Sequence, residues 1–127
     1  MLKLTYCLRR KSGMSWEEFS RYWREVHAPL VRERAEVLGI RRYLQVRTVQ
    51  NPALHERFQA RNGGSPEPYD GIAELWYDEM PAGSRDEAAR AAARELLEDE
   101  RNFIDLANSP MWVGEETAVV GPATPVS

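Results

Sequence analysis

A histidine near the end of a predicted helix is the clearest candidate for acid–base chemistry in this chain. His27 is one of only two histidines, and it lies two residues before Pro29. Because Pro29 lacks an amide proton and crowds the carbonyl of Glu25, the helix is expected to end or kink just after His27. The helix dipole at such an end favours the protonated imidazole, whereas burial among aromatic side chains favours the neutral form. His27 is therefore either a general acid or base, or a packed residue that caps helix carbonyls.

The helix that carries His27 has a recognisable start and an aromatic face. Ser15 and Glu18 have the spacing of a capping box, which predicts a helix that begins near Trp16. Side chains three and four residues apart share one broad face, which consists of Phe19, Tyr22, Trp23, Val26, His27 and Leu30. This pattern predicts that His27 faces the protein interior.

Other polar and aromatic side chains are candidates for binding a substrate. Glu74 lies in an otherwise apolar strand, so it is either an acid whose pKa is raised by desolvation or the partner of an arginine in an ion pair. Asp70 is either a binding residue or a turn residue that hydrogen-bonds its own backbone. Tyrosines can orient a phenol or enol oxygen, and tryptophans can line an aromatic pocket or fill a core. The predicted substrate-binding set is Tyr6, Trp23, Tyr43, Asp70, Glu74 and Trp76.

The sequence contains no recognisable motif for a metal ion or a common cofactor. Cys7 is the only cysteine, and the two histidines lie far apart, so no group has the spacing of metal ligands. Glycine-rich nucleotide-binding motifs and the G-x-S-x-G elbow are absent from the sequence. Haem ligation by His27 alone is a minor alternative, because one axial histidine suffices in some haem proteins. We predict no metal and no cofactor, and we assign no role to His55, which lies in a polar segment.

The composition is typical of one soluble globular domain, with 43% hydrophobic and 29% charged residues in a chain of 127. The net charge is −3 and the charges are interspersed, so neither nucleic acid nor a membrane surface is a predicted partner. No apolar run reaches the roughly 20 residues of a membrane helix, and the first residues lack the apolar region of a signal peptide. We expect a cytoplasmic protein with one domain over residues 1–121 and a loose tail over residues 122–127.

Hydrophobic periodicity predicts the order strand, helix, strand, strand, helix, strand. The strands are expected over residues 2–8, 40–49, 69–77 and 112–120, and the helices over residues 16–38 and 86–97. This order is typical of a ferredoxin-like α+β fold, with an antiparallel sheet and both helices on one face. Residues 50–68 are expected to form a long loop with one helical turn near residues 53–58. Ser84 and Glu87 have the spacing of a second capping box, and a short helix is expected near residues 103–106.

The third predicted strand indicates that both faces of the sheet are covered. Residues 72–77 are apolar on both faces apart from Glu74. Helices cover one face in a ferredoxin-like fold, so a monomer would expose a large apolar patch on the other. We therefore predict a homodimer in which two sheets pack face to face, which is a dimeric α+β barrel.

Several segments resemble the EthD family. They are residues 8–15, 22–31, 38–43, 69–76 and 99–105 and the strand that contains Glu115 and Glu116. The resemblance implies a ferredoxin-like fold that dimerises into an α+β barrel. Only His27 carries over by motif as a candidate functional residue, in the sequence His-Ala-Pro-Leu-Val. The chain departs from the family pattern mainly in residues 50–68, where substrate choice could reside.

The resemblance implies a class of chemistry rather than one reaction. The family takes its name from a small protein associated with bacterial degradation of ethyl tert-butyl ether, and fungal members resemble decarboxylases or dehydratases acting on phenolic and polyketide substrates. Structural cousins include cofactor-independent monooxygenases, muconolactone isomerases, polyketide cyclases and haem-degrading enzymes.

The leading functional hypothesis is a cofactor-independent enzyme of small-molecule catabolism or secondary metabolism. It would be of oxidoreductase, lyase or isomerase type, with His27 as general acid or base for an apolar or aromatic substrate. The main alternative is a non-catalytic carrier of a small molecule, or an accessory protein to an oxygenase. A third alternative is a dimer that serves only as an interaction module.

Overall fold

Four strands form a single antiparallel sheet in the computed structural model, which describes residues 2–79 and 86–123. The strands are β1 (Leu2–Leu8), β2 (Ile40–Arg47), β3 (Gly71–Tyr77) and β4 (Met111–Glu115). Their spatial order is β2-β3-β1-β4, with the first and third strands at the centre. This arrangement confirms the predicted ferredoxin-like α+β fold.

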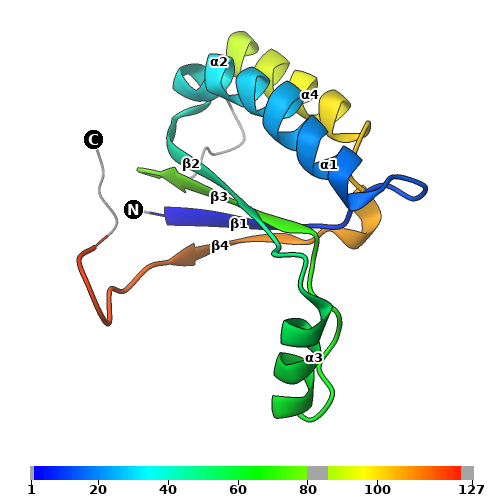
Figure 1. The fold of residues 1–127 in the computed structure, drawn as a ribbon. Coiled ribbons are helices and arrows are strands. Elements are labelled where there is room, and N and C mark those ends of the chain that lie inside the picture. The colour runs from blue at the N-terminus through cyan, green and yellow to red at the C-terminus, as the bar shows by residue number, and fades with distance from the viewer. Residues whose placement is uncertain (1, 80–85, 124–127) are drawn as a thin grey trace.

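The helices that cover the sheet lie on one of its faces (Figure 1). They are α1 (Trp16–Tyr22), the π-helix η1 (Trp23–His27), α2 (Ala28–Leu38) and α4 (Glu87–Glu100). The predicted capping box at the start of α1 is present, because Ser15 Oγ accepts from the Glu18 amide at 3.1 Å and the Glu18 carboxylate accepts from the Ser15 amide at 3.4 Å. Gly39 ends α2 with a φ of 73°, which confirms the predicted stop.

The helix does not end after His27, which was one of the two expectations for this point, but continues through α2 to Leu38, as the predicted range of residues 16–38 has it. The Ala28 amide donates to the carbonyl of Trp23, five residues earlier, so η1 is a single wide turn between α1 and α2. Pro29 lies in the first turn of α2, where a missing amide proton is tolerated. The wide turn thus lets the chain pass a proline without breaking the helix. Such π-turns are uncommon and occur frequently at functional sites.

Several other boundaries differ from the predictions. Residues 50–68 contain a full helix, α3 (Pro52–Arg61), which is capped by Asn51 and projects away from the sheet (Figure 1). The second and fourth strands end earlier than expected, at Arg47 and Glu115. Near residues 103–106 the only helical segment is a 3-10 turn, η2 (Leu106–Asn108). The end of the predicted tail, residues 124–127, lies outside the described residues.

The start of α4 differs from the predicted capping box. Asp86 is the N-cap, and its carboxylate accepts from the Ala89 amide at 2.8 Å. Ser84, the predicted cap, lies outside the described residues. An aspartate satisfies a free amide at a helix start as well as a serine does, so either residue type can fill this position.

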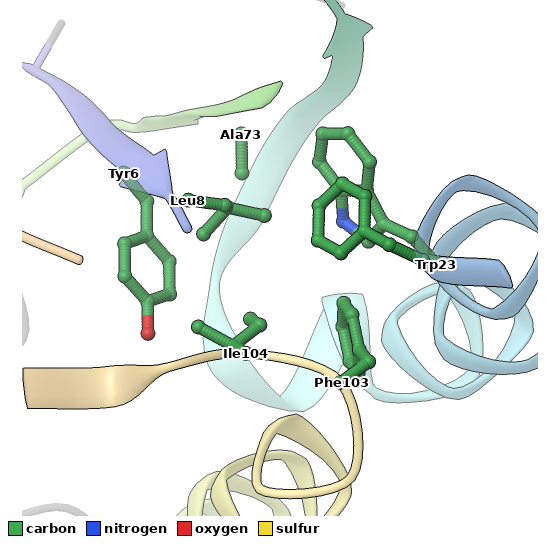
Figure 2. Packing of buried hydrophobic residues seen from close by; sticks show 7 residues of the cluster. Tyr6, Leu8, Trp23, Ala73, Phe103 and Ile104 are labelled. Atoms are coloured by element: carbon green, nitrogen blue, oxygen red, sulfur yellow. The ribbon is translucent and has the colours of Figure 1, made fainter. Parts of the chain in front are cut away.

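The core lies between the sheet and the helices. One cluster of buried side chains consists of Tyr6, Leu8, Phe19, Trp23, Ala73, Phe103 and Ile104. Figure 2 shows most of these side chains converging from β1, β3, η1 and the segment after α4. A second cluster consists of Val31, Leu38, Ile40, Tyr77 and Ala92. The opposite face of the sheet is partly exposed in the single chain: Val46 and Trp112 are 45% and 53% exposed, whereas Trp76 is buried.

Candidate functional site

A small cavity of about 60 Å³ lies between the sheet and the helical layer. Its wall includes Tyr6 from β1, Trp23 and His27 from η1, Tyr43 from β2, Ala73 from β3 and Glu100 from α4. Three tyrosine or tryptophan residues of the predicted binding set therefore meet His27 in one place. The remaining lining is chiefly aliphatic, so ionisable groups in this cavity are poorly solvated.

His27 is held in one orientation by a carboxylate. The side chain is buried, and its Nδ1 lies 2.7 Å from Asp99 Oδ2 at the end of α4. The hydroxyl of Tyr22 donates to the other Asp99 oxygen at 2.6 Å, and Asn102 Nδ2 donates to that hydroxyl at 3.0 Å. The ring of Phe103 lies 5.0 Å from the imidazole, measured between ring centroids. These contacts fix both the ring plane and the nitrogen that faces the carboxylate.

The environment of His27 favours a neutral imidazole. Burial lowers the pKa of His27, and the hydrogen bond and negative charge of Asp99 oppose that effect without cancelling it. An ionised Asp99 can only accept a hydrogen bond, so Nδ1 of the neutral imidazole carries the proton and donates to Asp99. This tautomer leaves a lone pair on Nε2. In the described part of the chain, Nε2 has no hydrogen-bond partner. The arrangement can therefore act as a general base at Nε2.

A second polar pair lines the same cavity. The hydroxyl of Tyr6 donates to Glu100 Oε1 at 3.0 Å. Burial raises the pKa of the Glu100 carboxyl, and the charge of Asp99 adds to the increase, while the hydrogen bond from Tyr6 lowers it. Burial and the neighbouring Glu100 raise the pKa of Tyr6 as well, so this phenol stays protonated.

Tyr43 closes the β2 side of the cavity. Gln45 Nε2 donates to the Tyr43 hydroxyl at 3.0 Å and to the carbonyl of Trp23 at 2.9 Å. Burial raises the pKa of Tyr43, so the phenol remains neutral. Gln45 therefore ties the second strand to η1 at the edge of the cavity.

The structure does not bring the other three predicted binding residues to this cavity. Ala73 and Leu75 of β3 line the cavity, and successive side chains of a strand point to opposite faces. Glu74 and Trp76 therefore lie on the other face of the sheet, where Trp76 is buried. There Glu74 forms an ion pair with Lys3 at 3.4 Å. The Trp76 ring lies between the charged ends of Lys3 and Arg42, each about 5.0 Å from its centroid.

Asp70 has a structural partner. Its carboxylate accepts from the backbone amide of Arg10 at 2.8 Å and from the Arg10 guanidinium at 2.7 Å. Asp70 thereby ties the segment before β3 to the segment after β1. It lies at a separate surface hollow between these segments and α3, which has a volume of about 460 Å³.

Sequence patterns did not indicate the carboxylate that holds His27, Asp99, or the carboxyl group that lines the cavity, Glu100. Asp99 and Glu100 lie in the last turn of α4, where no basic residue balances the negative end of the helix dipole. Two acidic residues at this unfavourable position are the signal that could have found them. They also belong to residues 99–105, one of the segments that resemble the EthD family.

Within residues 2–79 and 86–123, no three His, Cys, Asp or Glu side chains are grouped so that they could hold a metal ion. None of the helices there has the length and apolar character needed to cross a lipid bilayer. The cavity beside His27 is far smaller than a haem group.

Comparison with known proteins supports both the fold and the family. An EthD family protein of Bacillus halodurans C-125 superposes with a TM-score of 0.57 at 22% identity, covering 92% of this chain and 99% of that one. An EthD-like protein of Ralstonia eutropha JMP134 superposes with a TM-score of 0.58 at 18% identity, covering 96% of this chain and 95% of that one. HapK of Hahella chejuensis superposes with a TM-score of 0.54 at 11% identity, covering 98% of this chain and 100% of that one. Because the sequence profile of the EthD domain matches residues 11–107, this chain belongs to the EthD family.

Proposed function

We propose that this protein is a cofactor-independent enzyme of small-molecule catabolism or secondary metabolism in which His27 moves a proton on its substrate. The hydrogen bond of 2.7 Å between His27 Nδ1 and Asp99 Oδ2, at the wall of a cavity, is the main support for this assignment. A carboxylate in this position selects the tautomer, orients the ring and stabilises the imidazolium that forms when Nε2 accepts a proton.

The lining of the cavity supports an apolar or aromatic substrate. Leu8, Trp23, Val31 and Leu96 present hydrocarbon surface beside His27. The volume of about 60 Å³ is well below the roughly 300–1,000 Å³ of a complete ligand pocket. We therefore assign the cavity to the reacting group of the substrate, with the rest of the molecule extending outward past the cavity wall.

The test begins with a search for turnover. Purified protein is incubated with phenols, lactones and quinones, and native mass spectrometry together with chromatography detects bound ligands, changed masses and isomers. For a substrate found in this way, His27→Gln and Asp99→Asn should each lower kcat by about 10²–10⁴-fold, the usual contribution of a positioned acid or base. Circular dichroism checks that both variants fold.

The other histidine provides the matched control. His55 lies in α3, and its Nε2 is hydrogen-bonded to the carbonyl of Val49 at 2.7 Å, away from the cavity. His55→Gln should keep the turnover of the wild type. Unchanged turnover in folded His27→Gln would contradict the assignment, and a ligand that binds but is never altered would indicate a carrier instead.

A further inference from the structure

Glu100 is a carboxyl in the same cavity that the role of His27 does not use. Its only hydrogen-bond partner among the described residues is the hydroxyl of Tyr6, 3.0 Å from Oε1. No lysine or arginine in the described ranges forms an ion pair with it. A carboxylate enclosed beside apolar side chains without a cation is costly, so the neutral acid is favoured at this position.

The negative groups nearest Glu100 oppose its ionisation, and one hydroxyl group favours it. Asp99 adds a negative charge on the same turn, and the carbonyl end of α4 adds the negative end of the helix dipole. His27 is neutral in its own environment and contributes no positive charge. Tyr43 also faces this region as a neutral phenol, and the Tyr6 hydroxyl is the one group that stabilises the carboxylate.

The Tyr6 hydrogen bond also determines where an acidic proton would lie. Since the Tyr6 hydroxyl donates to Oε1, that oxygen acts as the acceptor of the carboxyl group. The proton of the neutral acid is then on Oε2, which is left to donate to a molecule in the cavity. A cavity of about 60 Å³ is small enough that a group bound in it contacts both His27 and Glu100, since both line its wall.

We propose that Glu100 is the acid that acts together with the His27 base, and that the substrate group bound between them is an enolisable carbonyl. His27 Nε2 accepts the proton from the carbon beside the carbonyl while Glu100 Oε2 gives its proton to the carbonyl oxygen. The C–H bond breaks, a C=C bond forms, and the carbonyl becomes the hydroxyl of an enol. The reverse steps return both protons, so no oxidant or reductant is needed. This assignment rests on the function proposed for His27.

The test measures hydrogen exchange at carbon. Cyclohexanone and 2-tetralone are incubated with the protein in D₂O, and NMR follows deuterium entering the position beside the carbonyl. We expect the wild type to accelerate exchange of at least one ketone, and Glu100→Gln to lose about 100-fold or more of that acceleration. Glu98→Gln is the matched control, because Glu98 lies in the same helix turn on the exposed side and should exchange like the wild type.

A measurement without substrate keeps the role of Glu100 testable if the glutamine variant fails to fold. Carbon-13 NMR of the wild type should show one glutamate carboxyl that titrates above the ordinary range. In Tyr6→Phe this pKa should rise further, because the hydrogen bond that stabilises the carboxylate is lost.

The outcomes separate this inference from the function proposed for His27. Exchange retained in folded Glu100→Gln, an ordinary titration of every glutamate, or no acceleration of either ketone by the wild type would each overturn the role of Glu100. Exchange that is lost in Glu100→Gln but kept in His27→Gln would support the acid and overturn the base. Turnover of other substrates that requires His27 but not Glu100 would support the proposed function and overturn the enol chemistry.

Discussion

At the scale of single residues, two opposing effects set the charge of His27. Burial disfavours the imidazolium, and the neighbouring Asp99 carboxylate favours it. The resulting neutral ring has a folded-state pKa below its ordinary value, so it accepts a proton only when a reaction supplies one. Burial has the opposite effect on the pKa of the Glu100 carboxyl, which it raises, so this group stays neutral by keeping its proton. A neutral base and a neutral acid can therefore coexist in one apolar cavity.

This electrostatic balance predicts how stability depends on pH. Because the pKa of His27 is lowered by folding, the unfolded chain binds that proton more tightly than the folded one. The contribution of neutral His27 to stability is complete when the pH is above the pKa of histidine in the unfolded chain, about 6.5. It is lost as the pH falls from there through the pKa of His27 in the folded protein. The free energy of unfolding in urea should thus decrease more in the wild type than in His27→Gln between about pH 8 and about pH 5.5.

The comparison isolates one residue because the remaining carboxylates titrate in both proteins. Glutamine keeps an amide that can donate to Asp99, so that carboxylate is not left without a partner. Parallel pH curves for the two proteins would contradict the assignment of a buried, neutral imidazole.

At the scale of elements, the site depends on one tight contact between a helix and a strand. The indole ring of Trp23 lies against the backbone of β3 at Gly71, and a Cβ added there would meet two ring atoms at 2.5 and 2.9 Å. Trp23 is also the first residue of η1, whose last residue is His27. The absence of a side chain at Gly71 therefore sets how closely the wide helical turn approaches the sheet.

We predict that Gly71→Ala destabilises the protein by about 1–3 kcal/mol, because the rigid indole must move within a packed core. The measurement is urea unfolding at equal protein concentration. Gly114→Ala on β4 is the matched control, since a Cβ there meets no atom within 4 Å and its stability should change by less than about 0.5 kcal/mol. Equal stability of the two variants would show that Trp23 is not held by this contact.

At the scale of the whole molecule, the helices cover only one face of the sheet. The other face presents Leu44, Val46 and Trp112 with exposed fractions between 36% and 53%. The pairing of Leu44 with Glu74 and of Trp112 with Thr5 places these side chains on the face opposite the cavity. Several exposed apolar side chains on one sheet face are typical of an interaction surface. A second copy of the chain is the partner that we propose for it.

This surface predicts a dimer whose stability depends on Trp112. Size-exclusion chromatography with light scattering should give twice the chain mass, and Trp112→Glu should raise the dissociation constant by about 30-fold or more, because a buried tryptophan in an interface contributes about 2 kcal/mol or more. Val37→Glu is the control, because it adds the same charge on α2, in the helical layer, at a side chain of similar exposure. A monomeric wild type, or equal effects of the two substitutions, would contradict the proposed interface.

Local sequence patterns determined most of the secondary structure and the fold class. Alternating apolar residues predicted β1, the spacing of Ser15 and Glu18 predicted the start of α1, and Gly39 predicted the end of α2. These features depend on neighbouring residues alone, since period, capping and backbone freedom are local properties. The order of the elements then indicated a ferredoxin-like sheet. Only one turn of α3 was predicted from the sequence. This helix has no buried residue, so it needs no regular apolar face and its hydrophobic periodicity is weak.

Only the tertiary structure decided which side chains form the site. His27 meets Asp99 across 72 residues of sequence, and Tyr6 meets Glu100 across 94, so no local pattern contains these pairs. They depend on how the end of α4 packs against η1 and the sheet. The register of β3 likewise places the side chain of Ala73 on the cavity side of the sheet and that of Glu74 on the other side. A register shift of one residue would exchange the faces of these two side chains. The sequence by itself predicted His27 as a candidate and predicted its helix, whereas packing and strand register placed Asp99 and Glu100 near it and set which aromatic residues surround it.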